Sequence, residues 1–282
     1  MMLSRAAECL DRIAATRWVV AYSGGVDSHV LLHHAVCFAQ SRPGINIRVV
    51  HINHQLQTES AAWARHCQQV CAELGVECDV VTVAVTLSAG DSVEQVARER
   101  RYRALASSLS AGEALLLAHH QDDQAETVLL QLLRGAGVKG LAAMGEVGQL
   151  GKGAVIRPLL NTPKADIDSY AMKERLVWIE DTSNRDLRFD RNRLRHQVLP
   201  LLQSHWPELG RTIARSAAHC ASADQLLTAQ AEADLVLAKV QADSVLVAPL
   251  LVLSGDRRRN AMRTWLQQLG VRQPDTCHWS QI

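Results

Sequence analysis

The segment Ser23–Ser28 (SGGVDS) places two adjacent glycines among hydroxyl and carboxylate side chains. Glycine has no side chain that would keep a phosphate away from the backbone. The serines add hydroxyl donors, and a helix expected to begin near Asp27 adds its positive end. Asp27 suits a phosphate only when a cation lies between them, so we assign it to Mg²⁺. We therefore predict a phosphate loop that consists of Ser23, Gly24, Gly25, Val26, Asp27 and Ser28.

The simpler alternative for this segment is a strand-to-helix turn, in which glycine relieves strain and serine or aspartate caps the helix. The flanking sequence favours the phosphate loop, because the apolar run Arg17–Tyr22 leads into it and the helical pattern His29–Ala39 follows it. A Walker loop would need Gly-Lys-Ser/Thr, which this segment lacks. The segment resembles the SGGxDS loop of the N-type ATP pyrophosphatases. That resemblance implies ATP as co-substrate, adenylation of a substrate oxygen and release of pyrophosphate.

A second chemical segment begins at His119 and reads HHQDDQAETVLLQLLRGAGVKG. If it is helical, His119, Asp123 and Glu126 lie at i, i+4 and i+7 on one face. One imidazole and two carboxylates suit an ammonium group, a cation or a general base. The alternative is an acidic first turn favoured by the helix dipole, which we prefer for Asp122 alone. We expect catalytic roles for His119, Asp123 and Glu126, beside Asp27.

The glycines at 135, 137 and 140 match G-x-G-x-x-G. A dinucleotide-binding fingerprint follows a strand and opens a helix, whereas this one follows the helical run 126–134. We therefore predict a loop that ends a helix near a substrate.

Short runs rich in Val and Ile alternate with longer amphipathic runs through most of the chain. This alternation predicts an α/β fold with a parallel sheet flanked by helices. The expected strands are 17–22, 45–53, 78–85, 114–118 and 156–160, and the expected helices are 29–39, 59–74, 92–108, 122–134 and 164–174. The glycine-rich stretch 135–153 is expected to form loops. Ligands of such sheets bind where the strands end, so we expect Ser23, His51–His54 and His119–His120 around one site.

Residues 211–240 hold many Ala, Leu and Gln and no Gly or Pro. We expect residues 1–205 to form an N-terminal catalytic domain and 206–282 a smaller, incomplete α-helical domain. The formal net charge of +1 gives no global argument for nucleic-acid binding. The seven cysteines, an odd number without a Cys-x-x-Cys pair, argue against a disulfide framework. With no leader-like N-terminus and no long apolar run, we expect a cytoplasmic protein without a membrane span.

Further segments of the chain resemble the pattern of the tRNA(Ile)-lysidine synthetase family. The matching segments are His51-Ile52-Asn53-His54, Ala97-Arg98-Glu99-Arg100-Arg101-Tyr102, the HHxDDQAET…LLRGxGxxGL element at 119–141, Arg157-Pro158-Leu159, Glu180-Asp181-Thr182-Ser183-Asn184 and Arg191-Asn192-Arg193-Leu194-Arg195. The resemblance covers about residues 15 to 200 in the family's order. It implies an adenine nucleotide alpha hydrolase-like, Rossmann-like fold.

The resemblance also implies the reaction of a ligase in tRNA modification. ATP adenylates the first anticodon cytidine of a minor tRNA(Ile) with the anticodon CAU, and free L-lysine then attacks carbon 2 to form lysidine. Pyrophosphate and AMP leave. On this basis Asp123 and Glu126 bind the lysine ammonium or take its proton. Arg98, Arg101, Arg191 and Arg195 contact tRNA phosphate or the lysine carboxylate.

The chain departs from the family pattern at Gln55-Leu56-Gln57, where the family usually has Gly-Leu-Arg. A homodimer is left open.

The nearest alternative function is that of a tRNA thiolase, which generally needs catalytic cysteines. Cys67 and Cys71 are expected on a surface helix instead. A non-catalytic ATP sensor would not need Asp123 and Glu126. A zinc site from His51, His54 and His120 lacks support from any cysteine pair.

Overall fold

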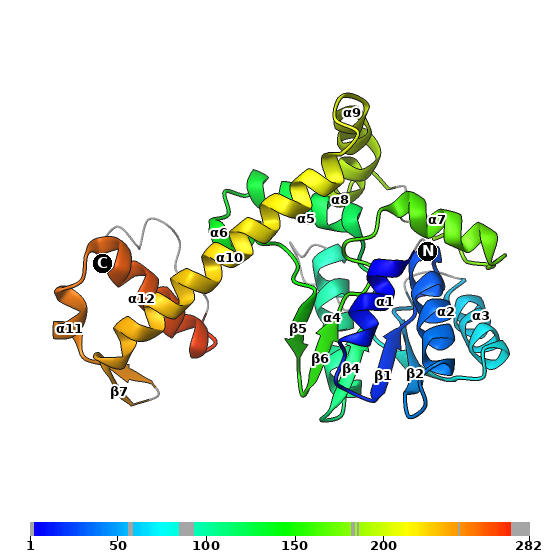
Figure 1. Cartoon of the computed structure of the whole chain (residues 1–282), viewed down its shortest axis with the longest axis horizontal. Helices are drawn as coiled ribbons and strands as arrows, with labels where there is room; N and C mark the ends of the chain where they lie inside the picture. The colour runs from blue at the N-terminus through cyan, green and yellow to red at the C-terminus, as the bar shows by residue number, and fades with distance from the viewer. Residues whose placement is uncertain are drawn as a thin grey trace. The chain divides into compact units, whose positions relative to one another are not determined.

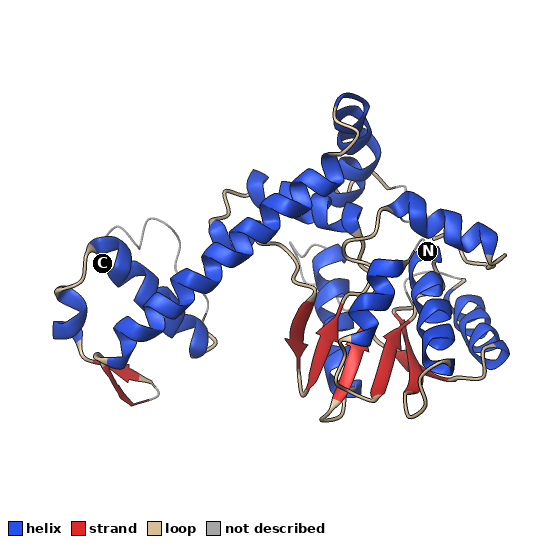
Figure 2. Cartoon of the chain, viewed as in Figure 1, coloured by secondary structure: helices blue, strands red, loops and turns tan. Residues whose placement is uncertain are grey.

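The computed structural model describes residues 3–55, 59–84, 93–181, 184, 186–241 and 243–271 (Figures 1 and 2). The chain divides into two compact units. The first comprises residues 1–134 and 143–215, and the second comprises 135–142 and 216–282. Within the described residues, no helix combines the length and the apolar character that crossing a membrane requires.

The first unit contains a six-stranded sheet and most of the helices. Its strands are β1 (Arg17–Ala21), β2 (Asn46–Asn53), β3 (Glu77–Thr82), β4 (Glu113–Leu116), β5 (Val147–Leu150) and β6 (Gly153–Ile156). Its helices are α1 (Ser4–Asp11), α2 (Val26–Gln40), α3 (Ser60–Glu73), α4 (Val93–Ser108), α5 (Gln121–Leu133), α7 (Lys164–Lys173), α8 (Asp190–Arg193), the π-helical turn η2 (Leu194–Val198), α9 (Leu199–His205) and the start of α10 (Leu209–Val236).

The strand order is β3-β2-β1-β4-β6-β5, and all neighbours are parallel except β5 with β6. From β1 the chain first adds strands on one side and then returns to add β4 on the other. The carboxyl ends of β1 and β4 therefore flank the point where the winding reverses, which is where open α/β sheets bind their ligands. The predicted mostly parallel sheet covered by helices is confirmed.

The sheet is buried on both faces because successive side chains of each strand point to opposite sides. Trp18 and Val20 of β1 pack with α1, α2, α3 and α7, whereas Val19 packs with Leu105 and Leu109 on the side of α4. All three β1 side chains are at most 1% exposed. This double burial explains why the strands read as continuous apolar runs.

The glycine-rich stretch departs from prediction, because residues 147–156 form the β5–β6 hairpin and not a loop. The expected strand 156–160 was also wrong, since β6 ends at Ile156. A side chain on Gly153 would lie 2.9 Å from the carbonyl oxygen of Glu113, so only glycine lets β6 begin beside β4. Gly151 forms the turn with φ +56°. These glycines therefore allow the hairpin turn and the close approach of β6 to β4.

Segment 190–205 changes its helical pitch within a few residues. The Leu199 N–H reaches back to the Leu194 carbonyl, five residues earlier. Pro200 follows and cannot donate the next helical hydrogen bond. The resulting π-helical turn carries Arg195 one turn after Arg191 of α8.

The second unit comprises the rest of α10, α6 (Val138–Leu141), β7 (Lys239–Gln241), β8 (Ser244–Val245), α11 (Val247–Leu251) and α12 (Gly255–Gln268). Leu235, Ala238, Leu250 and Ala261 form its small core. Helix α5 ends before Gly135, whose φ of +71° suits the residue that closes a helix. The predicted helix-ending loop at Gly135–Gly140 is confirmed, although it contains the short α6.

Candidate functional site

The predicted phosphate loop joins β1 to α2, as the sequence predicted. The Ser23 and Ser28 hydroxyls lie 3.0 Å apart, and Ser28 Oγ donates to the Gly25 carbonyl over 2.9 Å. The Ser23 N–H donates to the same Ser28 oxygen over 3.2 Å. The hydroxyls therefore fold the loop onto itself, while the first backbone N–H groups of α2 have no carbonyl partner within the helix. This is the arrangement that binds anions at helix N-termini.

Gly24 holds the loop in a conformation that other residues rarely adopt, with φ +89°. A side chain there would also lie 3.0 Å from Ile179 Cδ1 and 3.2 Å from Cys67 Sγ. The Gly24 carbonyl accepts a hydrogen bond of 2.9 Å from the Ile179 N–H. Segment 176–180 therefore fastens the loop from outside its own βα unit.

His51 supports the residue before the loop. Its Nδ1 lies 2.9 Å from the Tyr22 carbonyl oxygen, so this nitrogen carries the proton and donates it. Burial lowers the pKa of His51 despite that hydrogen bond, and the ring is neutral. Cys67 and Cys71 lie on the helix after β2, as expected, and both side chains are fully buried on the sheet side of α3.

Asp27 opens the site at the first turn of α2. Lys164 Nζ lies 2.6 Å from Asp27 Oδ1 and 2.8 Å from Asp168 Oδ1. His120 Nε2 lies 3.6 Å from Asp27 Oδ2. Burial alone would raise the pKa of Asp27, but His120 and Lys164 outweigh it and hold that pKa below its usual value. Asp27 is therefore an ionised carboxylate with two cationic or proton-bearing neighbours.

His120 caps helix α5 and also points into the site. Its ring Nδ1 accepts a hydrogen bond of 3.3 Å from the backbone N–H of Asp122. The backbone N–H of His120 donates to Asp123 Oδ2 over 3.0 Å. Because Nδ1 accepts, the proton of the neutral ring is on Nε2, which faces Asp27 and lies 3.4 Å from Asp123 Oδ2. Burial lowers the pKa of His120, but Asp27 and Asp123 outweigh it and raise that pKa.

The expectation that His119 shares a helical face with Asp123 and Glu126 was wrong, because α5 begins at Gln121. His119 Nδ1 instead accepts a hydrogen bond of 3.3 Å from Arg157 Nε. Burial lowers the pKa of His119 to about 3, so the ring is neutral. The imidazole between the two carboxylates Asp27 and Asp123 belongs to His120.

Asp123 and Glu126 are joined to the two arginines of the 190–198 segment. Glu126, with 0% exposure, accepts from Arg191 Nε at 2.7 Å and from Arg195 Nε at 2.5 Å. Asp123 Oδ1 lies 3.2 Å from Arg191 Nη2 and 2.9 Å from Arg195 Nη2. Burial would raise the pKa of Asp123, but His120 and these arginines lower it to about 2. Asp123 and Glu126, predicted to hold the lysine ammonium, and Arg191 and Arg195, predicted to contact phosphate or the lysine carboxylate, bind each other in this structure.

Arg98 and Arg101 both lie close to Tyr102, with guanidinium carbons 5.0 and 5.7 Å from its ring centre. Among the described residues neither arginine has a carboxylate in ion-pair contact. Burial lowers the pKa of Arg101, and the charge of Arg98 lowers it further. Arg157 lies near this group, and its Nη1 donates to the Gly145 carbonyl over 2.8 Å. The cluster suits an anionic group.

Sequence reasoning missed Lys164, which was expected only to start a helix, yet it contacts Asp27. His120 was expected around the site but without a catalytic role. The adjacent Asp-Asp pair, typical of a capped helix start, could have indicated its capping role. Leu56, Gln57, Thr182, Ser183 and Arg185 lie outside the described residues. Within the described residues, no three His, Cys, Asp or Glu side chains form a group that could hold a metal ion.

The sequence matches the models of two known protein families. One, described as a PP-loop domain, matches residues 2–202, and the other, described as a TilS substrate binding domain, matches residues 246–282. The first model contains the phosphate loop, α5 and the arginines of the 190–198 segment.

Curated relatives are similar over nearly the whole chain. The tRNA(Ile)-lysidine synthase of Coxiella burnetii is 48% identical over 95% of this chain and 59% of its own length. That of Pseudomonas fluorescens is 44% identical over 95% of this chain and 62% of its own length. The chain therefore spans about three fifths of the length of these relatives.

A solved structure shares the fold. The U34-tRNA thiolase NcsA of Methanococcus maripaludis superposes with a TM-score of 0.62 at 18% identity, over 77% of each chain. At this identity the likeness concerns the fold alone. Because a single family model covers well over half of the sequence, the chain belongs to the PP-loop domain family.

Proposed function

We propose that this chain contributes the catalytic part of a tRNA(Ile)-lysidine synthase. It would use ATP to adenylate the first anticodon cytidine of the tRNA with the anticodon CAU, and then join lysine to carbon 2 of that base. The observation that carries the proposal is the meeting of the phosphate loop with the Asp123–Glu126–Arg191–Arg195 group beside β1 and β4. The similarity to the two curated relatives gives the reaction its substrates.

The first step needs a place for the pyrophosphate that leaves ATP. The open N-terminal turn of α2 and the Gly24–Gly25 backbone offer N–H donors, and Lys164 offers a cation at the same turn. Asp27 fits Mg²⁺ as one carboxylate ligand, since this ion is typically held by one or two carboxylates together with phosphates and water. Bound Mg²⁺ would neutralise charge on the phosphates. Lys164 Nζ contacts Asp27 Oδ1, so the lysine would have to move aside for Mg²⁺ to bind at that oxygen.

The second step needs lysine with a neutral ε-amine close to the adenylated base. Asp123 and Glu126 are the acidic groups available for an ammonium, and Arg191 and Arg195 are available for a carboxylate. Because these groups neutralise each other in the free protein, lysine would exchange partners with them. A buried pair that opens for a ligand gives selectivity, since an unmatched ligand leaves a buried charge unpaired.

Arg98 and Arg101 would contact RNA phosphate. Both lie close to Tyr102 and have no carboxylate in ion-pair contact among the described side chains, so their charge is available to a ligand. An anticodon loop is single-stranded, so turning one cytidine out of it costs little.

The mass of tRNA(Ile) after incubation with ATP and lysine tests the proposal. We expect a gain equal to lysine minus one water, dependent on both co-substrates, together with pyrophosphate. Pyrophosphate release that ignores lysine and requires a sulfur donor would instead favour a thiolase. Nucleotide binding without any turnover, when the chain is tested with tRNA and lysine, would favour an ATP sensor.

A further inference from the structure

A polar hollow of about 610 Å³ lies beside Lys164, within the first unit of the chain. The first turns of α1, α5, α7 and α10 bound it, and its lining includes Arg5, Gln121, Thr162, Lys164, Gly210 and Arg211. The phosphate loop and the Asp123–Glu126–Arg191–Arg195 group do not line it. Lys164 connects the hollow to the phosphate loop, because its Nζ lies 2.6 Å from Asp27 Oδ1.

Two residues that line this hollow are mostly buried, and their polar side-chain atoms have no protein partner among the described residues. Gln121 is 8% exposed and Thr162 is 3% exposed. Among the described residues only their backbone groups are hydrogen-bonded, with the Gln121 N–H donating to the Thr162 carbonyl over 3.0 Å. The polar atoms of both side chains are absent from the set of fully buried, unpartnered ones, so they are accessible from the hollow. The Gln121 amide and the Thr162 hydroxyl are therefore free for a ligand.

The charges around the hollow indicate what kind of ligand fits. Its basic side chains (Arg5, Lys164 and Arg211) are matched by as many acidic ones (Asp122, Asp166 and Glu208). A bare phosphate would meet the acids, and a simple cation would meet the bases. A neutral, planar group with adjacent donors and acceptors fits both, and a glutamine amide can pair with the edge of a nucleobase through two hydrogen bonds.

The opposite wall of the hollow limits where the amide can lie. A side chain on Gly210, in the first turn of α10, would lie 3.1 Å from Gln121 Oε1. The backbone of α10 therefore lies directly against the amide and limits its rotation. Such restraint favours recognition of one edge of a ligand.

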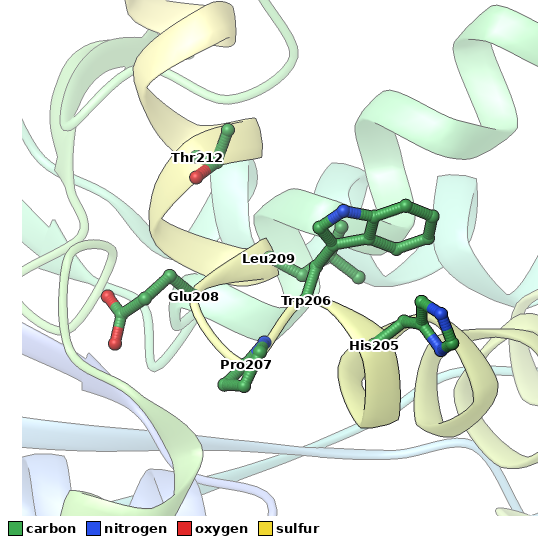
Figure 3. Close-up of a pocket in the computed structure, with 6 residues that line it drawn as sticks. All are labelled: His205, Trp206, Pro207, Glu208, Leu209 and Thr212. Atoms are coloured by element: carbon green, nitrogen blue, oxygen red, sulfur yellow. The ribbon is translucent and has the colours of Figure 1, made fainter.

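A neighbouring hollow points to RNA and not to a free nucleotide. It measures about 440 Å³ and is lined by the α9–α10 junction, and Pro207 and Glu208 line both hollows (Figure 3). Trp206 is 58% exposed, and its ring centre lies 5.5 Å from that of His205. Exposed aromatic rings stack with unpaired bases, and successive bases of a loop need successive binding places.

We infer that the hollow beside Lys164 receives an unpaired nucleobase of the RNA substrate, next to the base that reacts, and that Gln121 and Thr162 bind its edge. This inference rests on the proposed function, because it takes the RNA substrate from it. It assigns a recognition role to residues outside the reaction itself.

The test is fluorescence anisotropy of the full 282-residue chain with the labelled anticodon stem-loop of tRNA(Ile). Each loop nucleotide is replaced in turn by an abasic one. We expect the wild-type chain to bind about tenfold more weakly when one particular base other than the reactive cytidine is missing, as loss of one recognised base predicts. Gln121→Met should bind the intact RNA about tenfold more weakly. Removal of that same base should not weaken the binding of this variant any further. Thr162→Val should show the same pattern to a smaller degree.

Gln68→Met is the matched control, because Gln68 is exposed on α3 and outside both hollows. It should keep the wild-type profile, and all variants should keep the wild-type unfolding midpoint because no hydrogen bond of these side chains is lost. An abasic profile retained by Gln121→Met would overturn the inference and leave the proposed function standing. RNA binding unchanged but ATP binding weakened would assign the hollow to the nucleotide and overturn the inference. Absence of RNA binding by the wild-type chain would overturn both.

Discussion

Asp27 and Lys164 form a charge pair whose side chains are 32% and 30% exposed. A partly exposed pair contributes little to stability, so its placement at the phosphate loop is better explained by ligand binding. Lys164 has a second carboxylate partner, Asp168, on its own helix. The two aspartates thus touch the same ammonium group, but only Asp27 lies on the phosphate loop.

This difference gives a matched test of Asp27. We expect Asp27→Asn to lower ATP-dependent pyrophosphate release at least 100-fold, as loss of an electrostatic group in contact with the reacting phosphates typically does. RNA binding should change less than twofold. Measurement of initial rates with saturating ATP, RNA and lysine checks this.

Asp168→Asn is the control, since it removes the other partner of the same lysine. Its rate should stay within a factor of three of the wild type. Equal losses in the two variants would mean that Asp27 acts only by holding Lys164.

The acidic residues of α5 show what sequence reasoning can and cannot give at this scale. The types and spacing of Asp123 and Glu126 indicated chemistry, and both lie in the site. Their partners could not be read from the sequence, because Arg191 and Arg195 are more than sixty residues away and meet them only through the tertiary fold. Local periodicity predicts faces of one helix and does not predict which other segment covers them.

At the scale of elements, the start of α5 decides the geometry. The helix begins one residue after His120, so its imidazole serves as the cap and places Nε2 toward Asp27. One residue thus supports both the helix and the site. Strand positions were predicted well from Val- and Ile-rich runs such as β1. The β5–β6 hairpin was missed because it is rich in glycine, and the need for Gly153 arises from a tertiary contact with Glu113 that the sequence does not show.

The two roles of His120 can be separated by substitution. Asparagine is a good N-cap residue and alanine is a poor one. We expect His120→Ala to reduce the free energy of unfolding by about 1 kcal/mol more than His120→Asn does. Both variants should lose pyrophosphate release similarly, because both lack the contact with Asp27. Chemical denaturation and rate measurements on the same samples check this, and equal stability of the two variants would contradict the capping role.

At the scale of the whole molecule, buried neutral histidines make the fold sensitive to acid. His34 lies edge-on to Tyr170, and its Nε2 is buried without a hydrogen-bond partner in the described structure. Burial, together with the charge of His33, lowers the pKa of His34 to about 4. Between pH 6.5 and 4 the unfolded chain therefore binds a proton that the folded chain does not, and stability falls as the pH falls.

We expect this histidine alone to remove about 2 kcal/mol of unfolding free energy between pH 7 and pH 5. His34→Leu should therefore lose less stability than the wild type over that interval. Urea denaturation at the two pH values, followed by circular dichroism, measures the difference. Parallel losses in both proteins would show that His34 is protonated in the folded state as readily as in the unfolded one.

The hydrogen bond from Ile179 to Gly24 has a consequence for the order of events during synthesis. A nascent chain that has emerged only as far as α5 already contains the whole phosphate loop and strands β1 to β4. It still lacks the Ile179 N–H that holds Gly24, and it lacks Arg191 and Arg195 to neutralise Glu126. Because such distant contacts form late, we expect a ribosome-bound fragment ending near residue 134 to be unable to retain nucleotide. We therefore expect nucleotide binding to begin only after the ribosome has delivered the last part of this unit.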